Sequence, residues 1–382
     1  GDITVSGGTA TEFDSLLALE GTNVNITGLN LTVDGSTVSV TQANNLTATT
    51  SGTVTATLTS GAVADLTDLT ADTDNNAALS ITITDNSASA ADLNTINAAT
   101  TLAVDATAIA TISASTLGAI STLGGAITGG QFAATNAIAT INVSGDAIDY
   151  TTLGSEIDRF DDFRTDPAIA TFVLADTTTV TLGSQTEVDN FLADVTANLV
   201  SVSGASQAVT VTAAPGGVDI SHTDAIALAA AAGGTVTATI VSGTTVDQLK
   251  TLYDAGETNA YTITIDNADA TGSTAAEFNA INSATSVAIN AAAVTSLSGT
   301  ASDIATLMSA ATDAEQFTGA SFDSVAANGL SITGTAIDVT DLNNALSRTT
   351  AVSNNTVLAT FASAQGDITV SGGTATEFDS LL

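Results

Sequence analysis

The sequence GDITVSGGTATEFDSLL occupies residues 1–17 and recurs without a single change at residues 366–382. An identity of this length indicates a tandem duplication, because chance matches do not extend over so many consecutive positions. We therefore predict that residues 1–365 form one full period and that residues 366–382 begin the next. The alternative is that the second segment was appended during cloning. If the repeat is natural, both segments should adopt the same conformation.

A second, more diverged similarity lies inside this period. GTVTATLTSG at 52–61 matches GTVTATIVSG at 234–243, and AADLNTINAATTLAVDATAI at 90–109 matches AAEFNAINSATSVAINAAAV at 275–294. The similarity spans residues 52–113 in the first half and 234–298 in the second. The period is thus expected to consist of two diverged halves, each of which is a row of smaller units.

Each small unit begins with a strand pattern. Val54, Ala56 and Leu58 alternate with threonines, and the same alternation returns in the matching stretch at 234–243. A period of two residues predicts a strand with one packed face and one threonine-rich face.

A helix start follows each strand. A Ser or Thr stands three residues before an Asp, Glu or Gln, which is the capping-box pattern that satisfies free backbone N–H groups. An apolar residue follows directly, with apolar partners three or four positions later, which predicts a short helix with one buried stripe. The capping pairs are Thr9/Glu12, Ser89/Asp92, Ser184/Glu187, Thr245/Gln248, Thr274/Glu277 and Thr300/Asp303.

A strand, a capped helix and a return of about 25 residues cannot bury their apolar faces alone, whereas stacked copies can. The sequence therefore predicts an α/β solenoid: an elongated, parallel β-helix-like stack of short strands with short capped helices. Parallel strands need a crossover connection, and a short helix supplies it. Two stretches, 21–58 and 199–220, alternate without a helical pattern and are expected to contain strands only.

The charge balance limits the partners of the chain. It has 40 acidic and 4 basic residues and a formal net charge of −36. Nucleic-acid binding needs clustered Lys and Arg, so we exclude it. The uncharged stretch 106–145 is interrupted by Thr, Ser, Gly and Asn, and it never forms the roughly 20-residue apolar run of a membrane span. No basic and apolar leader is visible, and we expect any targeting segment to lie outside this sequence.

The residues needed for catalysis do not converge. His222 is the only histidine, with Asp219 and Asp224 nearby, but the strained GxSxG turn of a serine nucleophile is absent. Polysaccharide-cleaving β-helix enzymes use carboxylates or basic residues in a cleft lined with aromatics, which are scarce here. We therefore expect no enzymatic activity, no required cofactor, and a structural role for His222 near a helix start.

Calcium is the one metal that the sequence suggests. Carboxylate and amide oxygens at alternate positions are typical of calcium loops, although the Gly and the later Glu of an EF-hand are missing. The arginines of the second cluster offer local ion pairing as an alternative. The candidate ligands are Asp72, Asp74 and Asn76 in one loop and Asp161, Asp162 and Asp166 in the segment EIDRFDDFRTDP.

Two longer blocks resemble a known group of proteins. SITITDNSASAADLNTINAATTLAVDATAIATIS at 80–113 and TSVAINAAAVTSLSGTASDIATL at 285–307 are similar to the repeat regions of very large bacterial cell-surface proteins, notably those of marine picocyanobacteria. The resemblance implies secretion, a position outside the cell or on its surface, and a structural role. It supplies no catalytic residues.

Two functions remain open at this stage. The first is a non-enzymatic structural repeat that builds a filament, stalk or surface layer (S-layer) by end-to-end stacking, with adjacent copies of the chain as its partner. The second is an adhesin whose outward threonine rows bind a surface, a cell-surface glycan or ice.

Overall fold

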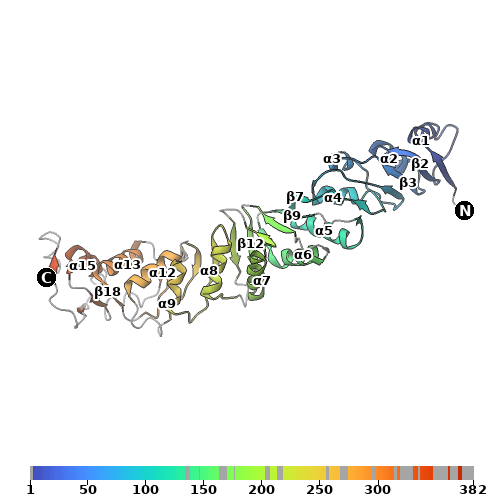
Figure 1. The fold of residues 1–382 in the computed structure, drawn as a ribbon. Coiled ribbons are helices and arrows are strands. Elements are labelled where there is room, and N and C mark those ends of the chain that lie inside the picture. Colours follow the sequence, from blue (N-terminus) through green and yellow to red (C-terminus); the bar gives the residue numbers. More distant parts are fainter. Residues whose placement is uncertain are drawn as a thin grey trace. The chain divides into compact units, whose positions relative to one another are not determined.

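The computed structural model places strands and helices in regular alternation along the chain (Figure 1). It divides into two compact units. Unit 1 contains Gly1–Thr178 with Ala193–Ser203, and unit 2 contains Thr179–Leu192 with Gly204–Leu382. The structure describes residues 3–133, 138–145, 147–162, 170–175, 177–202, 207–212, 218–254, 258–266, 274–294, 297–313, 316–318, 330–333, 336–346, 360–361 and 369–371.

Unit 1 is built from short parallel strands and the helices between them. One sheet has the order β1-β2-β3-β4, a second has β13-β11-β9-β7-β5, and β6 pairs with β8. Its strands are β1 (Thr4–Gly8), β2 (Asn30–Val38), β3 (Val54–Leu58), β4 (Ala77–Ser80), β5 (Ser87–Ser89), β6 (Val104–Asp105), β7 (Thr111–Thr116), β8 (Phe132–Ala133), β9 (Thr140–Ser144), β10 (Ala147–Asp149), β11 (Thr171–Leu174) and β13 (Val200–Ser201). Its helices are α1 (Ala10–Leu17), α2 (Val40–Thr49), α3 (Val63–Leu66), α4 (Ala90–Asn97), α5 (Leu117–Thr128) and α6 (Tyr150–Asp162).

Unit 2 repeats this plan. Its strands pair in the orders β12-β14-β15-β16 and β18-β20-β22, with the additional pairs β17-β19 and β21-β23. They are β12 (Thr179–Leu182), β14 (Ala208–Val211), β15 (Val236–Thr239), β16 (Ala260–Thr262), β17 (Ile289–Asn290), β18 (Leu297–Thr300), β19 (Phe317–Thr318), β20 (Leu330–Thr333), β21 (Ala336–Asp338), β22 (Thr360–Phe361) and β23 (Thr369–Ser371). The helices are α8 (His222–Ala231), α9 (Val246–Leu249), α10 (Thr251–Asp254), α12 (Ala275–Ala284), α13 (Ala301–Asp313) and α15 (Val339–Leu346), together with α7 (Gln185–Thr196), whose residues from Ala193 on belong to unit 1.

All strand pairs among the described residues are parallel, and none of these sheets closes into a barrel. Neighbouring strands such as β2 and β3, or β15 and β16, are joined through helices, as parallel strands require. The parallel α/β architecture predicted from the alternation of strand and helix patterns is therefore confirmed.

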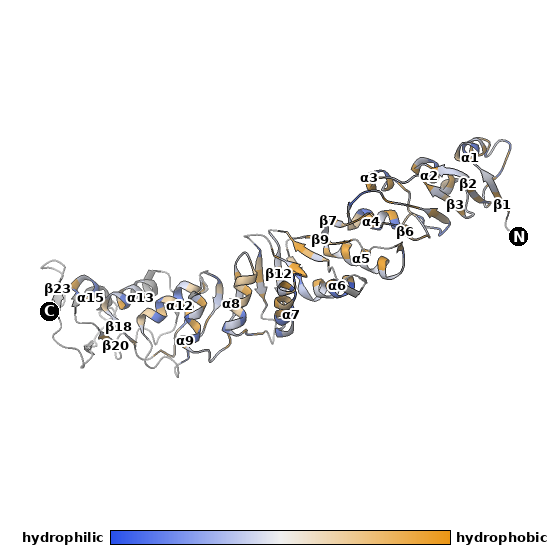
Figure 2. Cartoon of the chain, viewed as in Figure 1, coloured by the Kyte–Doolittle hydropathy of each residue, from blue (hydrophilic) through white to orange (hydrophobic). Residues whose placement is uncertain are grey.

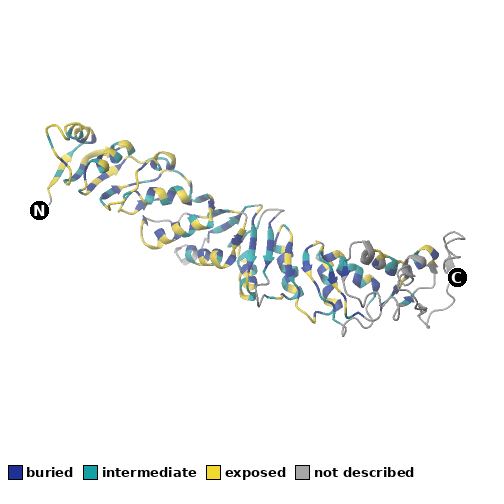
Figure 3. Cartoon of the chain, turned by 180° about the vertical axis from the view of Figure 1, so that it is seen from behind, coloured by how far each residue is buried: buried dark blue, intermediate teal, exposed yellow. Residues whose placement is uncertain are grey.

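The strand faces differ as the period-two pattern predicts. In β3, Val54, Ala56 and Leu58 are buried while the threonines between them are exposed. Figure 3 shows that the described helices carry both buried and exposed residues, and Figure 2 shows that they carry both hydrophilic and hydrophobic residues. The cores are built mainly from Ala, Val, Ile and Leu.

One expectation about local structure is wrong. The stretch 21–58 contains a helix, α2, although its alternating residues predicted strands only. Ser39 caps this helix, and Gln42 completes a capping box with it. The cap decides the outcome because it satisfies N–H groups at the helix start, which the β-branched Val40 and Thr41 alone do not. In 199–220, the described elements β13 and β14 are strands.

Candidate functional site

The first group of calcium candidates lies in the loop before β4. The two carboxylate oxygens of Asp72 accept hydrogen bonds from the backbone N–H groups of Asn76 and Ala77, both at 3.0 Å. The Asn76 side chain donates to the carbonyl of Thr50 at 3.3 Å, and Asp74 is exposed. These residues border a surface hollow of about 140 Å³. The contacts of Asp72 order the loop, and they explain this residue without a metal ion.

The second group lies at the end of α6. Asp161 and Asp162 belong to the last turn of this helix, but the placement of their side chains is not described, and Asp166 lies outside the described residues. Over the part of the chain that the structure describes, no three or more His, Asp or Glu side chains gather in a way that could hold a metal ion. Calcium binding stays a prediction for both groups.

The capping pairs predicted from the sequence are confirmed. Thr9, Thr245 and Thr274 form complete capping boxes with Glu12, Gln248 and Glu277. Ser89, Ser184 and Thr300 accept from the N–H group three residues later. Sequence reasoning missed three further caps, at Ser39, Thr116 and Ser221. The cap at Ser221 makes His222 the first residue of α8, so its predicted position near a helix start is confirmed, while its structural role stays a prediction.

Counting from the N-cap, the fourth and seventh following residues form the buried stripe of most described helices; in α1 the seventh, Leu16, is only partly buried. In α4 these are Leu93 and Ile96, and in α12 they are Phe278 and Ile281. Buried residues at the seventh position are Leu46, Ile96, Leu123, Glu156, Phe191, Leu228, Leu252, Ile281 and Leu307. Because every such helix packs on its sheet through these positions, the stripe sets the distance at which the next strand can lie.

The fifth position after the N-cap contacts a neighbouring helix. Asn94 of α4 donates to the carbonyl of Ala119 in α5 at 3.0 Å, and Asn279 of α12 donates to that of Asp303 in α13 at 2.9 Å. Asn44 of α2 likewise donates to the carbonyl of Asp68 at 2.8 Å. The sequence carries this signal as an asparagine five residues after the caps of α2, α4 and α12, but its meaning depends on residues that lie 24 or 25 positions further along the chain.

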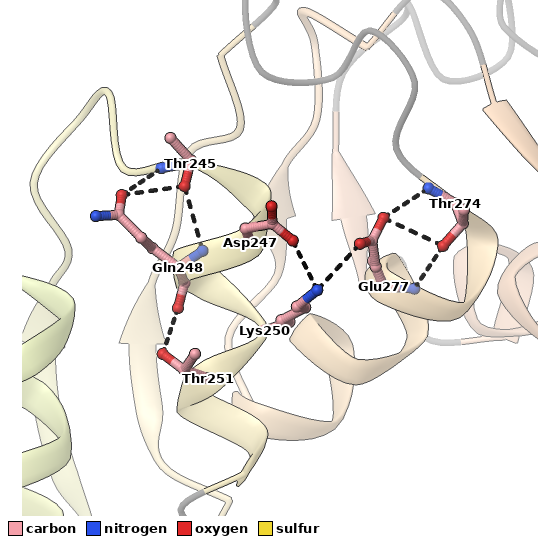
Figure 4. A network of polar contacts seen from close by, with 7 residues as sticks. All are labelled: Thr245, Asp247, Gln248, Lys250, Thr251, Thr274 and Glu277. Carbon is pink, nitrogen blue, oxygen red and sulfur yellow. Dashed lines mark hydrogen bonds and ion pairs between the residues drawn. The ribbon is translucent and has the colours of Figure 1, made fainter.

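A lysine takes this position between α9 and α12. Figure 4 shows Lys250 between two carboxylates: its ammonium nitrogen lies 2.6 Å from Asp247 and 3.3 Å from Glu277. These hydrogen bonds, first to Asp247 and then to Glu277, raise the pKa of Lys250 above its ordinary value. Glu277 is also the capping-box residue of Thr274, so one carboxylate serves its own helix start and the neighbouring helix.

Three threonines, of which Thr50 and Thr285 are buried and Thr100 is half-buried, make a second set of contacts at the turn that follows the helix. The hydroxyl of Thr50 donates to the carbonyl of Leu29 at 2.6 Å, that of Thr100 to Leu79 at 2.7 Å, and that of Thr285 to Tyr261 at 2.7 Å. The same hydroxyl oxygens accept from the N–H group two residues later. Each threonine therefore closes its own turn and joins it to the segment 21 to 24 residues earlier.

One helix departs from this pattern. In α6 the seventh position holds Glu156, which is only 2% exposed. Its carboxylate lies 2.8 Å from the Arg159 guanidinium, which also donates to the carbonyl of Ser121 in α5. Gly124 of α5 faces the pair, and a Cβ atom there would stand 3.0 Å from side-chain atoms of both residues. A buried carboxylate is thus tolerated because a cation and a missing side chain accompany it.

The same helix contacts a second acid. The Tyr150 hydroxyl donates to the carboxylate of Asp194. Burial raises the pKa of Asp194 above its ordinary value, and the negative charge of Asp158 adds to this shift, while the hydrogen bond from Tyr150 opposes it. Asp194 therefore costs stability when it is ionised.

No family model matches the sequence, and neither does any curated protein or solved structure. None of the described helices is long and apolar enough to span a membrane.

Proposed function

We propose that the chain is a non-enzymatic structural repeat of a very large extracellular protein, in which solenoid units stack end to end to form a filament, stalk or surface layer at the cell surface. Its main partner is then another copy of itself. The supporting observation is that equivalent residues of the two halves, such as Asn94 and Asn279, make the same contact with the next helix.

The solenoid arrangement is supported by the strand pairing of the stretch 77–89, which pairs at two points with earlier residues and at two points with later residues. The stretch 77–89 pairs with earlier residues through β4 and through the bridge between Gly61 and Ile83. It pairs with later residues through β5 and through the bridge between Thr82 and Asp105. Parallel pairing at successive points with the same two neighbours is the arrangement expected when coils stack on coils.

The energetics favour stacking over independent folding. Residues such as Leu79, Ile81 and Ile83 are each 2% exposed or less, and they belong to a short stretch that pairs with earlier and later parts of the chain. Burying a Leu or Ile side chain contributes about 1.5–3 kcal/mol, and here the neighbouring coils supply the surface that buries it. A repeat of this kind gains its stability from its neighbours, and extension by further copies adds more of the same contacts.

The absence of enzymatic activity is part of the proposal. His222 serves as a helix-start residue, and the nearby Asp224 accepts hydrogen bonds from Ser221 and Gln185. The acidic residues make local contacts at helix starts and in loops. Acids at these positions are favoured by the free N–H groups and the helix dipole, by about 0.3–1 kcal/mol each. The excess of negative charge follows from this repeated use.

The alternative is an adhesin, and β3 is the observation that favours it. Thr53, Thr55 and Thr57 are exposed in a row, and Thr55 lies opposite Thr32 of β2. On the other side of β3, however, Thr55 lies opposite Ala78, so the threonines do not extend into a wide flat array. Glycan-array and ice-affinity measurements test this function, because a scaffold without a binding role gives no signal in either.

Electron microscopy of native material tests the structural proposal. Long, thin fibres or a periodic layer with a regular axial repeat are the expected result. Isolated compact particles, with no fibre or layer at the cell surface, would contradict it. A chain that binds glycans but forms no fibre would favour the adhesin.

A further inference from the structure

One three-residue strand occurs twice in the chain and has different neighbours in its two places. Thr4-Val5-Ser6 of β1 pairs with β2, in the register Thr4 with Asn30 and Ser6 with Thr32. The identical Thr369-Val370-Ser371 forms β23 and pairs with β21, with Thr369 opposite Ala336 and Ser371 opposite Asp338. The same sequence is therefore a strand in both places, as the duplication predicts for these residues.

The two places differ in which neighbour is present. Strands inside a sheet, such as β2 or β7, pair with an earlier strand on one side and a later strand on the other. Among the described residues, β1 pairs only with the later strand β2, whereas β23 pairs only with the earlier strand β21. β23 shows the earlier neighbour of this strand, and β1 shows its later neighbour. A strand can pair in both registers at once, because the two neighbours lie on opposite sides of it.

The burial of α1 also points to a missing earlier neighbour. Leu16 is the seventh residue after the N-cap Thr9, a position that is buried in the other helices. Here it is only partly buried, and it lines a surface hollow of about 230 Å³ together with Val5 and Phe13. The hollow lies between the strand and the stripe of the helix, where an earlier unit lies in the interior of the repeat.

We propose that this hollow and the free side of β1 receive the end of a preceding copy of the same chain, with β21 and α15 as the occupying elements. Ser6 then lies between Asp338 of the preceding copy and Thr32 of its own. This inference rests on the proposed function, since it requires copies in tandem. It adds which surfaces meet and in which register.

The helix contacts give the join a second anchor. In both α4 and α12, the asparagine at the fifth position donates to the carbonyl of the third residue after the next N-cap. Asp338 caps α15 by accepting from the N–H group of Thr340 at 2.8 Å, which makes Asn343 its fifth position. The third residue after Thr9 is Glu12, which lines the hollow. The fifth position of α15 in one copy and the third position after the cap of α1 in the next are thus the backbone positions that we expect to meet at the join.

Thiol labelling tests the join, because the chain contains no cysteine. In a chain with a complete second period after residue 365, Leu16→Cys places one thiol at the outer copy, and Leu381→Cys places an identical thiol at the join. We expect labelling at 381 to be at least about tenfold slower than at 16, because burial blocks the reagent. Equal rates would overturn the proposal.

A stability measurement separates burial from a local effect of the cysteine. Leu381→Ala should lower the thermal unfolding midpoint of the two-period chain by several degrees, while Leu16→Ala should lower it by much less. Equal shifts would contradict the join. If labelling shows no protection but native material still forms fibres, the join is wrong while the structural function stands. If the thiol at 381 is protected but native material forms no fibres, the join is right and the proposed structural function is wrong.

Discussion

Helices α4 and α6 occupy comparable places in unit 1, but they reach their common neighbour α5 by different means. In α4 the fifth position after the cap is Asn94 and the seventh is Ile96. In α6, which follows Asp149, these positions hold Gly154 and Glu156. Asn94 donates forward to Ala119 of α5, whereas Arg159 donates back to Ser121 of the same helix.

The difference shows what contact with a neighbouring helix requires. Both α4 and α6 bury two positions of their stripes and make a polar contact with α5, but the residue that makes the contact can change if its surroundings change with it. In α6 the acid at the seventh position is accompanied by Arg159 and by the space at Gly124. In α4 an apolar residue fills the stripe and an amide makes the contact.

The largest expected loss of stability comes from placing a glutamate, the residue that α6 carries at the seventh position, at the same position of α4. Ile96→Glu buries a carboxylate where no arginine stands in the stripe, and an uncompensated buried charge costs about 3–5 kcal/mol. Urea unfolding followed by far-UV circular dichroism measures the loss. Ile96→Val is the control and should cost about 1 kcal/mol. An effect of Ile96→Glu no larger than that of the control would show that the stripe of α4 is not buried by stacking.

A second prediction removes the cation from α6. Arg159→Met leaves Glu156 without its partner and should cost about 2 kcal/mol, less than a fully buried pair because the Arg159 side chain is 35% exposed. The double variant Glu156→Leu with Arg159→Met should recover the stability of the parent, since an apolar stripe is what the other helices carry. A double-mutant cycle of unfolding free energies measures this coupling. Additive effects of the two substitutions would contradict a direct interaction.

The third prediction uses two adjacent glycines of α5. Gly124→Ala brings a Cβ atom against Arg159 and Glu156 and should cost about 1 kcal/mol in unfolding free energy. Gly125→Ala meets nothing within 4 Å and should stabilise the helix by about 0.5–1 kcal/mol. Differential scanning calorimetry of both variants compares them. Stabilisation by both substitutions would show that α6 does not approach α5 at Gly124.

The fourth prediction tests the amide contact of α4. Asn94→Ala removes the hydrogen bond to Ala119 and should cost about 1 kcal/mol, measured by urea unfolding. Thr95→Ala is a suitable control, because the hydroxyl of Thr95 donates only within its own helix, to Ala91. Equal effects of the two substitutions would assign the loss to the helix itself and not to its neighbour.

The smallest expected effect concerns the pH dependence of stability at Asp194 of α7, which accepts the hydrogen bond from Tyr150 of α6. Because burial raises the pKa of Asp194 in the folded protein, its ionisation costs stability above the folded pKa, and this cost disappears as the pH falls towards the unfolded pKa. Asp194→Asn should therefore be slightly more stable than the parent at pH 7, with a gain that vanishes at acidic pH. Thermal unfolding across this range measures the difference. A gain that is constant with pH would contradict the assignment.

The local elements could be predicted from the sequence, because their signals are local. Alternation identified the strand at 54–58, and the pairs around Ser89 and Thr274 identified helix starts. The alternation did not predict α2, because β-branched Val38, Val40 and Thr41 are typical of a strand, although Ser39 and Gln42 form a capping box at its start. The parallel pairing followed from the spacing of strands and helices.

The contacts between neighbours could not be predicted in the same way. Asn94 and Thr100 are polar residues that would be exposed on an isolated unit, and their partners lie 21 to 25 residues away in the chain. The sequence around Glu156 is typical of an exposed acidic residue, although the Glu156 side chain is buried beside Arg159. For the calcium candidates, the alternate spacing of Asp72 and Asp74 did not reveal that Asp72 orders its own loop.

The central claim is that units are buried by stacking on their neighbours. Small-angle X-ray scattering from chains of one and two periods is its most direct test. The account predicts that the cross-sectional radius stays constant and that the length grows in proportion to the number of periods. A compact protein instead gains radius only as about the 0.38 power of its residue number. An increase of that kind, with a growing cross-section, would contradict the account.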